Sequence, residues 1–240
     1  MSSGFTLDHP AFRGTGRSIR VAVIDSGVHI GNPHITPPVT GVHLTETGLD
    51  FDAVDRLGHG TAVSAAILEK APHIEWHAYR VFDRNLATSA VILARAITMA
   101  ADAECRLINL SLGTANPERA AVMRAAVDHA TQRNAIIVSA FELNATKWLP
   151  GSLAGVAGVR LDSSCPRNEL HIGEVDGSPV FMASGLPRPI PAVPPEQNLQ
   201  GISFAVANVT GFLARLLESK PHLRTPRDVL DFLQRDAPNS

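Results

Sequence analysis

Three polar residues lie in short glycine-containing segments whose residue types suit nucleophilic catalysis. Asp25 ends the apolar run of VAVIDSGV, His59 stands between two glycines in LGHGTAVSAAI, and Ser203 follows the segment Gly-Ile in GISFAVANVTG. A serine hydroxyl becomes a nucleophile when an imidazole takes its proton and a carboxylate orients that imidazole. The three segments together therefore predict acyl-transfer chemistry.

Each of these residues has a simpler explanation when it is taken alone. An aspartate after a strand often closes a turn or caps a helix, and a serine at the start of a helix is a preferred N-cap. A histidine on its own is most often a surface residue. The catalytic interpretation depends on all three segments occurring in one chain, each at the end of an expected element.

The elements expected around the three segments place them at strand and helix ends. A buried strand over 19–24 ends beside Asp25, an Ala-rich helix over 60–70 follows His59, and a long helix over 203–219 begins at Ser203. Further strands are expected at 75–82, 106–110 and 135–140, and further helices at 88–103, 117–133 and 226–235. This alternation predicts an α/β fold with a mostly parallel central sheet and helices on both faces.

The chain is expected to form a single domain over residues 1–240, with a core from about 19 to 235 and residues 1–18 as an N-terminal extension. The Pro-rich stretch LPRPIPAVPP at 186–195 is expected on the surface, because proline cannot sit in a central strand. It is not taken as a domain boundary, since the catalytic segments lie on both sides of it.

Composition and charge favour no nucleic-acid or membrane partner. Basic and acidic residues, 21 and 23 in number, are spread along the chain, and no apolar run reaches the length of a membrane span. No signal peptide is visible, so a cytoplasmic location is expected. Cys105 and Cys165 are expected as reduced thiols, since their spacing fits no zinc motif. No metal site and no cofactor are expected, and the cluster Asp50, Asp52 and Asp55 is interpreted as a solvated loop.

The segments IDSGV, GHGTAV and GISFA resemble the three active-site motifs of the subtilisin family, in which Asp, His and Ser follow one another in this order. INLSLGT, AAVDHATQRNAIIVSA and VFMASG are also similar to segments of that family, so the resemblance covers about residues 19–235. It implies a serine endopeptidase that acts on peptide or protein substrates. In it Ser203 is the nucleophile, His59 the base and Asp25 the carboxylate that orients the base.

The resemblance also assigns a substrate-binding edge and a pocket. Ser111, Leu112 and Gly113 correspond to the edge that pairs with an extended substrate backbone, and Ala140 and Phe141 lie where the family lines its first specificity pocket. Phe141 stands at a position where the family has glycine. We therefore expect the pocket to accept small or shallowly bound side chains.

The chain departs from the family at the oxyanion hole. The backbone N–H of Ser203 is expected as one donor, but Glu142 stands where the family has an asparagine that supplies the second. Asn144, two residues further on, is the preferred alternative, because an amide donates at every working pH whereas Glu142 donates only when it is protonated.

Two other functions were considered. Glu142 and Phe141 favour a catalytically impaired relative that only binds peptides, whereas the complete set of Asp, His and Ser favours an enzyme. A nucleotide-binding protein is set aside, because GTGRS at 14–18 precedes the first buried strand and is not part of a phosphate-binding motif. The specificity is expected to be narrow. One such role is the removal of a leader from a precursor peptide inside the cell.

Overall fold

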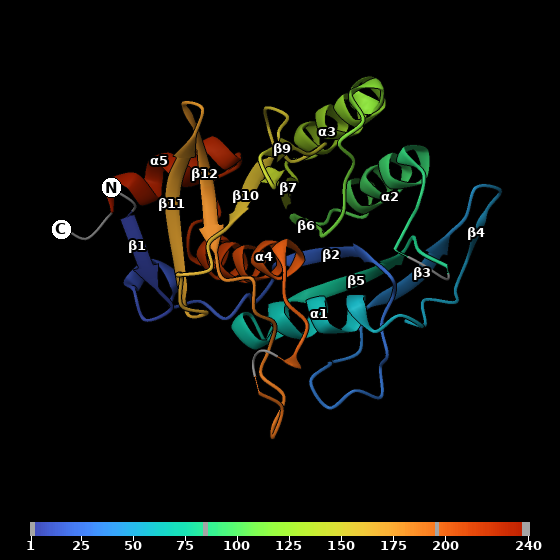
Figure 1. The fold of residues 1–240 in the computed structure, drawn as a ribbon, viewed down its shortest axis with the longest axis horizontal. Coiled ribbons are helices and arrows are strands. Elements are labelled where there is room, and N and C mark those ends of the chain that lie inside the picture. The colour runs from blue at the N-terminus through green and yellow to red at the C-terminus, as the bar shows by residue number, and fades with distance from the viewer. Residues whose placement is uncertain (1–2, 84–85, 195–196, 237–240) are drawn as a thin grey trace.

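A ten-stranded sheet runs through the computed structural model, which describes residues 3–83, 86–194 and 197–236 (Figure 1). The strands are β1 (Ser3–Thr6), β2 (Arg20–Asp25), β3 (Thr40–Leu44), β4 (Leu49–Asp50), β5 (Glu75–Arg80), β6 (Leu107–Leu110), β7 (Ile136–Ala140), β10 (Ala157–Leu161), β11 (Glu169–Val175) and β12 (Ser178–Ala183). Their order is β1-β11-β12-β10-β7-β6-β2-β5-β3-β4. A separate hairpin is made by β8 (Glu142–Leu143) and β9 (Thr146–Lys147).

The centre of the sheet is parallel and its two ends are antiparallel. All neighbours from β12 through β10, β7, β6, β2 and β5 to β3 are parallel pairs. The antiparallel pairs are β1 with β11, β11 with β12, and β3 with β4. The predicted α/β class with a mostly parallel sheet is confirmed.

Helices cover both faces of this sheet. The α-helices are α1 (His59–Lys70), α2 (Ala90–Asp102), α3 (Ala120–Gln132), α4 (Ile202–Ser219) and α5 (Pro226–Arg235), with short 3-10 helices η1 (Pro10–Phe12) and η2 (Pro117–Arg119). Side chains alternate along a strand. In β2, Val21 and Val23 therefore belong to the core cluster that contains residues of α1, α4 and α5, whereas Ala22 and Ile24 belong to the cluster that contains residues of α2 and α3.

The longest helix, α4, lies inside the molecule. Nearly all of its side chains from Phe204 to Leu217 are buried, and it packs against α1 and several strands. At Gly211 an added Cβ would lie 2.7 Å from the Cβ of Lys70, so α1 and α4 approach closely there. Lys70 itself is buried at the end of α1.

Most expected elements agree with the structure, with shifted ends. The last helix, 226–235, is confirmed, and it begins with a capping box in which Thr225 and Asp228 each accept a hydrogen bond from the other's backbone N–H. The helix expected from residue 117 starts as the 3-10 turn η2, and α3 begins only at Ala120. The strand expected over 75–82 ends at Arg80.

The first eighteen residues contribute more to the core than expected. β1 pairs with β11 and forms one edge of the sheet, while Phe5 and Phe12 are buried. Phe12 packs edge-on against Phe212 of α4, with ring centres 5.1 Å apart. The core therefore begins near residue 4 and not at 19. The single domain stays a prediction.

The two ends of the described chain meet at this edge. His9 Nδ1 lies 4.0 Å from Asp236 Oδ2, just beyond the end of α5. Among the described helices, none combines the length and the apolar character that a membrane crossing requires. Cys105 and Cys165 are both free and buried, as expected.

Candidate active site

Asp25 and His59 form a direct pair at the carboxyl end of β2. Asp25 is buried, and its Oδ1 lies 2.7 Å from His59 Nδ1 and accepts a second hydrogen bond from the N–H of Ser26 at 2.7 Å. Donation from Nδ1 to a carboxylate fixes the imidazole tautomer, which leaves Nε2 with a free lone pair. His59 can therefore act as a base through Nε2.

The surroundings of His59 favour its charged form. Burial lowers the pKa of His59, but the hydrogen bond and the charge of Asp25, together with the charge of Asp55, outweigh burial and raise this pKa above its ordinary value. The imidazolium that forms during proton transfer is thereby stabilised.

The carboxylate of Asp55 joins the loop after β2 to the start of α1. Its Oδ1 accepts hydrogen bonds from Ser26 Oγ and from the N–H of Gly58, both at 2.8 Å. Its Oδ2 accepts from the N–H and the hydroxyl of Thr61, at 2.9 and 2.6 Å. Ser26 Oγ in turn accepts from the N–H of Gly60 at 2.8 Å. Through hydrogen bonds to their neighbours, Asp55 thus fixes the positions of Asp25 and His59 relative to each other.

Glycine is required on both sides of His59. Gly58 is the N-cap of α1, has a positive φ of 80° and offers no side chain to the free N–H groups of the first turn, which Asp55 satisfies instead. A Cβ on Gly60 would lie 2.3 Å from the carbonyl oxygen of Gly27. The sequence interpretation missed the role of Asp55 at the start of α1, because it assigned Asp55, together with Asp50 and Asp52, to a solvated loop.

Ser203 lies in the first turn of α4 and is tied to the end of β6. Its Oγ donates to the carbonyl oxygen of Ser111 at 3.2 Å, and Ser111 Oγ donates to the carbonyl oxygen of Ser203 at 3.3 Å. Within the described residues no hydrogen bond joins Ser203 to His59, although both line one cleft. Such catalytic contacts are often long or poorly aligned without substrate.

A buried polar chain behind Ser203 supports this arrangement. Thr210 Oγ1 donates to Asn109 Oδ1 at 2.9 Å, and Asn109 Nδ2 lies 2.9 Å from Ser111 Oγ. Asn109 and Thr210 are fully buried. The sequence interpretation missed both, although a polar residue inside the apolar strand LINL and another inside a buried helix were visible signals.

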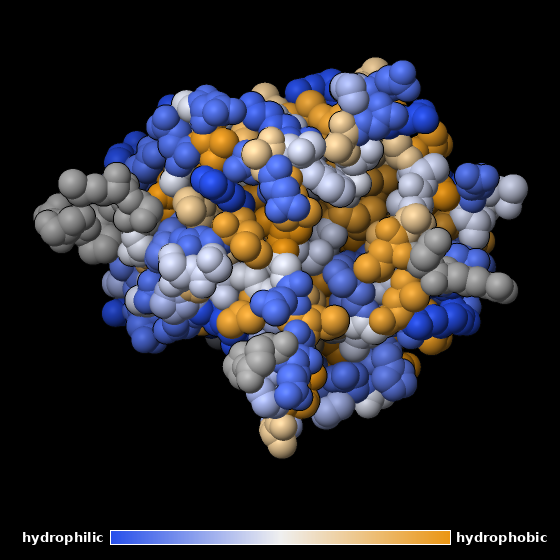
Figure 2. Space-filling view, viewed as in Figure 1, coloured by the Kyte–Doolittle hydropathy of each residue, from blue (hydrophilic) through white to orange (hydrophobic). Residues whose placement is uncertain are grey.

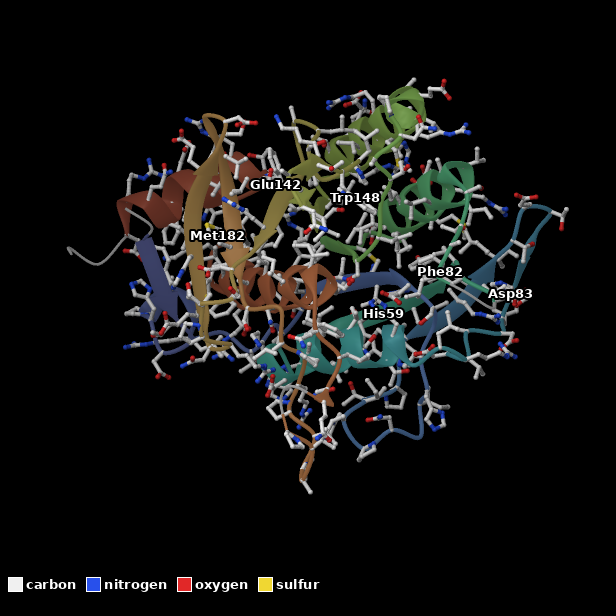
Figure 3. All side chains as sticks on the ribbon, viewed as in Figure 1. His59, Phe82, Asp83, Glu142, Trp148 and Met182 are labelled. Atoms are coloured by element: carbon white, nitrogen blue, oxygen red, sulfur yellow. The ribbon has the colours of Figure 1, made fainter. Side chains whose placement is uncertain are left out.

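The cleft holds most of the predicted site. Its volume is about 290 Å³ and its lining is mostly apolar. Figure 2 shows hydrophobic residues near the centre of this face, and Figure 3 labels three of the lining residues, His59, Phe82 and Trp148. Its lining residues are His59, Phe82, Leu86, Ser111, Leu112, Gly113, Ala140, Leu143, Trp148, Ile202, Ser203 and Val206. The predicted edge residues Ser111, Leu112 and Gly113 and the predicted Ala140 thus lie beside Ser203. Phe82, Leu143 and Trp148 were not predicted.

Three predicted residues lie outside this lining. Phe141 is buried and packs against Gly158, so Leu143 and Trp148 take the pocket position expected for it. Glu142 Oε1 lies 3.1 Å from Arg160 Nε on β10, and Figure 3 shows Glu142 beyond Trp148 as seen from His59.

Asn144 is exposed in the two-residue turn of the hairpin β8–β9. Both turn residues, Asn144 and Ala145, have a positive φ, of 50° and 59°. Tight hairpin turns of this kind require left-handed residues, and asparagine adopts that conformation readily. The turn therefore explains this asparagine, and the expected donation to an oxyanion has no support from its position.

A larger hollow borders the other side of the α1 N-terminus. It has a volume of about 850 Å³ and is formed by the start of α1, the loop after β2 and the Pro-rich segment. Its lining includes His29, His34, Asp55, Thr61, Arg188, Ile190, Val193 and Leu199. The Pro-rich segment is thus at the surface, as expected, and forms one wall of this hollow.

Comparison with known proteins gives consistent matches. Residues 16–141, just over half of the chain, match the model of the Subtilase family. The nisin leader peptide-processing serine protease of Lactococcus lactis subsp. lactis is 31% identical over 155 residues, which cover 52% of this chain and 23% of that protein. The chain thus aligns with less than two thirds of this relative's length.

Two solved structures share the fold. A cold adapted subtilisin-like serine proteinase superposes with a TM-score of 0.70 at 20% identity, covering 92% of this chain and 82% of that chain. The prenylagaramide maturation protease superposes with a TM-score of 0.65 at 24% identity, covering 90% and 82%. At these identities the structures support the fold alone.

Replacing Asp55 with Asn should lower the pKa of His59, because it removes one of the negative charges that stabilise the imidazolium. It should also destabilise the fold by about 1–2 kcal/mol, since the N–H groups at the start of α1 lose a charged acceptor. NMR titration of the His59 ring and urea unfolding measure the two effects. Asp50→Asn, at an exposed carboxylate of the preceding hairpin, should change neither. An unchanged His59 pKa in Asp55→Asn would contradict the role given to Asp55.

Glu142→Gln and Asn144→Ala should each change kcat for a peptide ester by less than about threefold, because neither side chain lines the cleft. The pH dependence of kcat from pH 5 to 9 should also stay unchanged in both. A loss of about 10²–10³ in either variant would show that this side chain reaches the oxyanion during turnover.

Proposed function

Because this chain belongs to the subtilase family, we propose that it is a serine endopeptidase in which Asp25, His59 and Ser203 form the catalytic triad. The observation that carries the proposal is the 2.7 Å contact between His59 and Asp25 in a cleft that also contains Ser203. The charge-stabilised base His59, its partner Asp25 and the nucleophile Ser203 are thus held by separate elements near the carboxyl ends of the central strands.

The reaction begins when the Ser203 hydroxyl rotates from the Ser111 carbonyl toward His59 Nε2. His59 takes the hydroxyl proton as Ser203 Oγ attacks the scissile carbonyl carbon, and Asp25 stabilises the imidazolium. His59 then gives the proton to the leaving amine, and an acyl group remains on Ser203. Water, activated by His59 in the same way, releases the acyl group and restores the serine.

The tetrahedral intermediate needs hydrogen-bond donors for its oxyanion. The N–H of Ser203 is one of the first-turn groups of α4, which have no partner inside a helix. Apart from the triad, the side chains in the described cleft that carry a donor are those of Ser111 and Trp148. The second donor therefore comes from one of these two side chains or from the backbone.

Substrate would bind as an added strand along residues 111–113. Backbone pairing of this kind needs no particular side chain, so selectivity comes from the pocket beside it. That pocket is small and walled by large apolar side chains, chiefly Phe82, Leu143 and Trp148. We infer a preference for one compact apolar residue next to the cleaved bond.

We further propose that the substrates are precursor peptides from which a leader is removed. Support comes from a relative named as a nisin leader peptide-processing protease and from a structural neighbour named as a prenylagaramide maturation protease. The small apolar pocket also favours narrow specificity over general digestion. The cytoplasmic location expected from the sequence remains a proposal and is consistent with processing inside the cell.

The alternative is a peptide-binding protein with impaired catalysis. Two observations favour it: the Ser203 hydroxyl donates to the carbonyl oxygen of Ser111, and Glu142 stands where the family has an asparagine. Such a protein would bind peptides along residues 111–113 without an activated serine.

A fluorophosphonate probe, which reacts with activated serines, separates the two functions. The wild-type chain should be labelled, and Ser203→Ala should lose labelling and at least about 10⁴-fold of peptide cleavage while its circular dichroism is unchanged. Ser219→Ala, at the far end of the same helix, is the matched control and should be labelled normally. An unlabelled but folded wild-type chain would support the peptide-binding alternative.

Substrate class is tested by comparing leader-bearing precursor peptides with unfolded casein. We expect mass spectrometry to show one cleavage in a precursor with a compact apolar residue before the cut, and little digestion of casein. Trp148→Ala should broaden the residues accepted at that position, because it removes one wall of the pocket. Rapid digestion of casein at many sites would contradict the narrow specificity and leave the triad unaffected.

A further inference from the structure

Three side chains of the types that bind zinc meet at the crossing from β10 to β11. Asp162 follows β10, Cys165 lies in the connecting loop, and His171 is on β11. One ligand atom from each lies within 4.8 Å of the others. None of the three lines the cleft. We propose that Asp162, Cys165 and His171 form a zinc site with three protein ligands, separate from the residues proposed to act in catalysis.

The distance between two of the ligand atoms already fits a shared ion. His171 Nδ1 lies 3.3 Å from Asp162 Oδ2. In a tetrahedral zinc site with bonds of about 2.0–2.1 Å, a nitrogen and an oxygen ligand are separated by roughly 3.3–3.4 Å. The ion can therefore enter without displacing either side chain.

The neighbouring hydrogen bonds orient both groups as ligands. His171 Nε2 lies 3.1 Å from Glu169 Oε2, and donation to this carboxylate leaves the Nδ1 lone pair directed toward Asp162. Metal-binding histidines almost always donate their other N–H in this way. Asp162 Oδ1 accepts from the N–H and the hydroxyl of Ser164, at 2.9 and 2.6 Å, so Oδ2 is the oxygen left for the ion.

Cys165 completes the set from the buried side. Its thiol is buried and donates to the backbone carbonyl oxygens of Pro166 and Glu169, at 3.5 and 3.4 Å. Without an ion it therefore keeps its proton. On binding, a zinc–sulfur bond replaces the S–H bond and the proton leaves to solvent. One thiolate and one carboxylate then balance the two charges of zinc, and a fourth position is open to water.

The position of the site gives the ion a structural role. β10 and β11 are not neighbours in the sheet, because β12 lies between them. The ion would join the end of β10, the loop and β11, and so fix a connection that backbone pairing does not. Space for the histidine ring comes from Gly4 of β1, where an added Cβ would lie 3.1 Å from ring atoms.

The sequence interpretation expected no metal, because the spacing of the two cysteines fits no zinc motif and the acidic cluster at 50–55 was interpreted as a solvated loop. Asp162, Cys165 and His171 are three different residue types, and their spacing in the sequence forms no recurring metal-binding motif. Only the fold shows that their ligand atoms converge.

Metal titration of the reduced, EDTA-dialysed wild-type chain tests the proposal. Co²⁺ should bind at one equivalent and produce the near-ultraviolet charge-transfer band of a thiolate ligand, and Zn²⁺ should displace it. Zinc should also raise the melting temperature, since it binds the folded state. Cys165→Ser and His171→Gln should remove the band or weaken binding at least about tenfold. Cys105→Ser, at the other buried free cysteine, is the matched control and should keep it.

Three outcomes would overturn the site. The first is a wild-type chain that takes up no metal, in which case His171 only pairs with Asp162 and Glu169. The second is a charge-transfer band that survives in Cys165→Ser. The third is a band lost in Cys105→Ser. The wild-type titration is decisive even if Cys165→Ser fails to fold, and probe labelling of Ser203 reports on the protease proposal independently.

Discussion

Burial of α4 is the constraint on which the rest of the molecule depends. Each fully buried Leu or Phe side chain contributes roughly 1.5–3 kcal/mol, and α4 carries several of them between α1 and the sheet. A helix buried on most sides must also satisfy its polar groups. Asn208 donates to the carbonyl oxygens of Ser184 and Leu186, at 2.8 and 3.2 Å, and Thr210 bonds to Asn109. These specific partners fix the rotation and height of the helix, and with them the position of Ser203.

The catalytic pair depends on a second, electrostatic constraint. Asp25 ends a buried strand and His59 begins a helix, so the two residues move independently unless something joins their loops. The carboxylate of Asp55 does this, and burial raises its pKa less than its hydrogen bonds from Thr61, Leu57 and Ser26 lower it. It therefore stays ionised and holds both loops. The buried carboxylate of Asp25 contacts the imidazole directly, while the half-buried carboxylate of Asp55 positions the segments that carry both residues.

Much of the fold and the position of the candidate site could be predicted because both are encoded locally. A few residues are enough to indicate where each of these elements begins or ends. They are the run IRVAVI, the glycines around His59 and the segment around Ser203 that opens α4. What could not be predicted depends on distant contacts. Glu142 is directed by Arg160 on another strand, and the side chains of the proposed zinc site converge only through the crossing to β11. Alignment alone cannot show where a side chain turns when the loop that carries it is rebuilt as a hairpin.

The meeting of the two chain ends at the β1 edge has a practical consequence. His9 and Asp236 are in contact range, and neither residue lines the cleft at the carboxyl ends of the central strands. A short linker between the ends would therefore allow circular permutation, with new termini opened in an exposed loop. Attachment at this edge would also leave the residues that line the cleft free of the support, so that long peptides could still reach them.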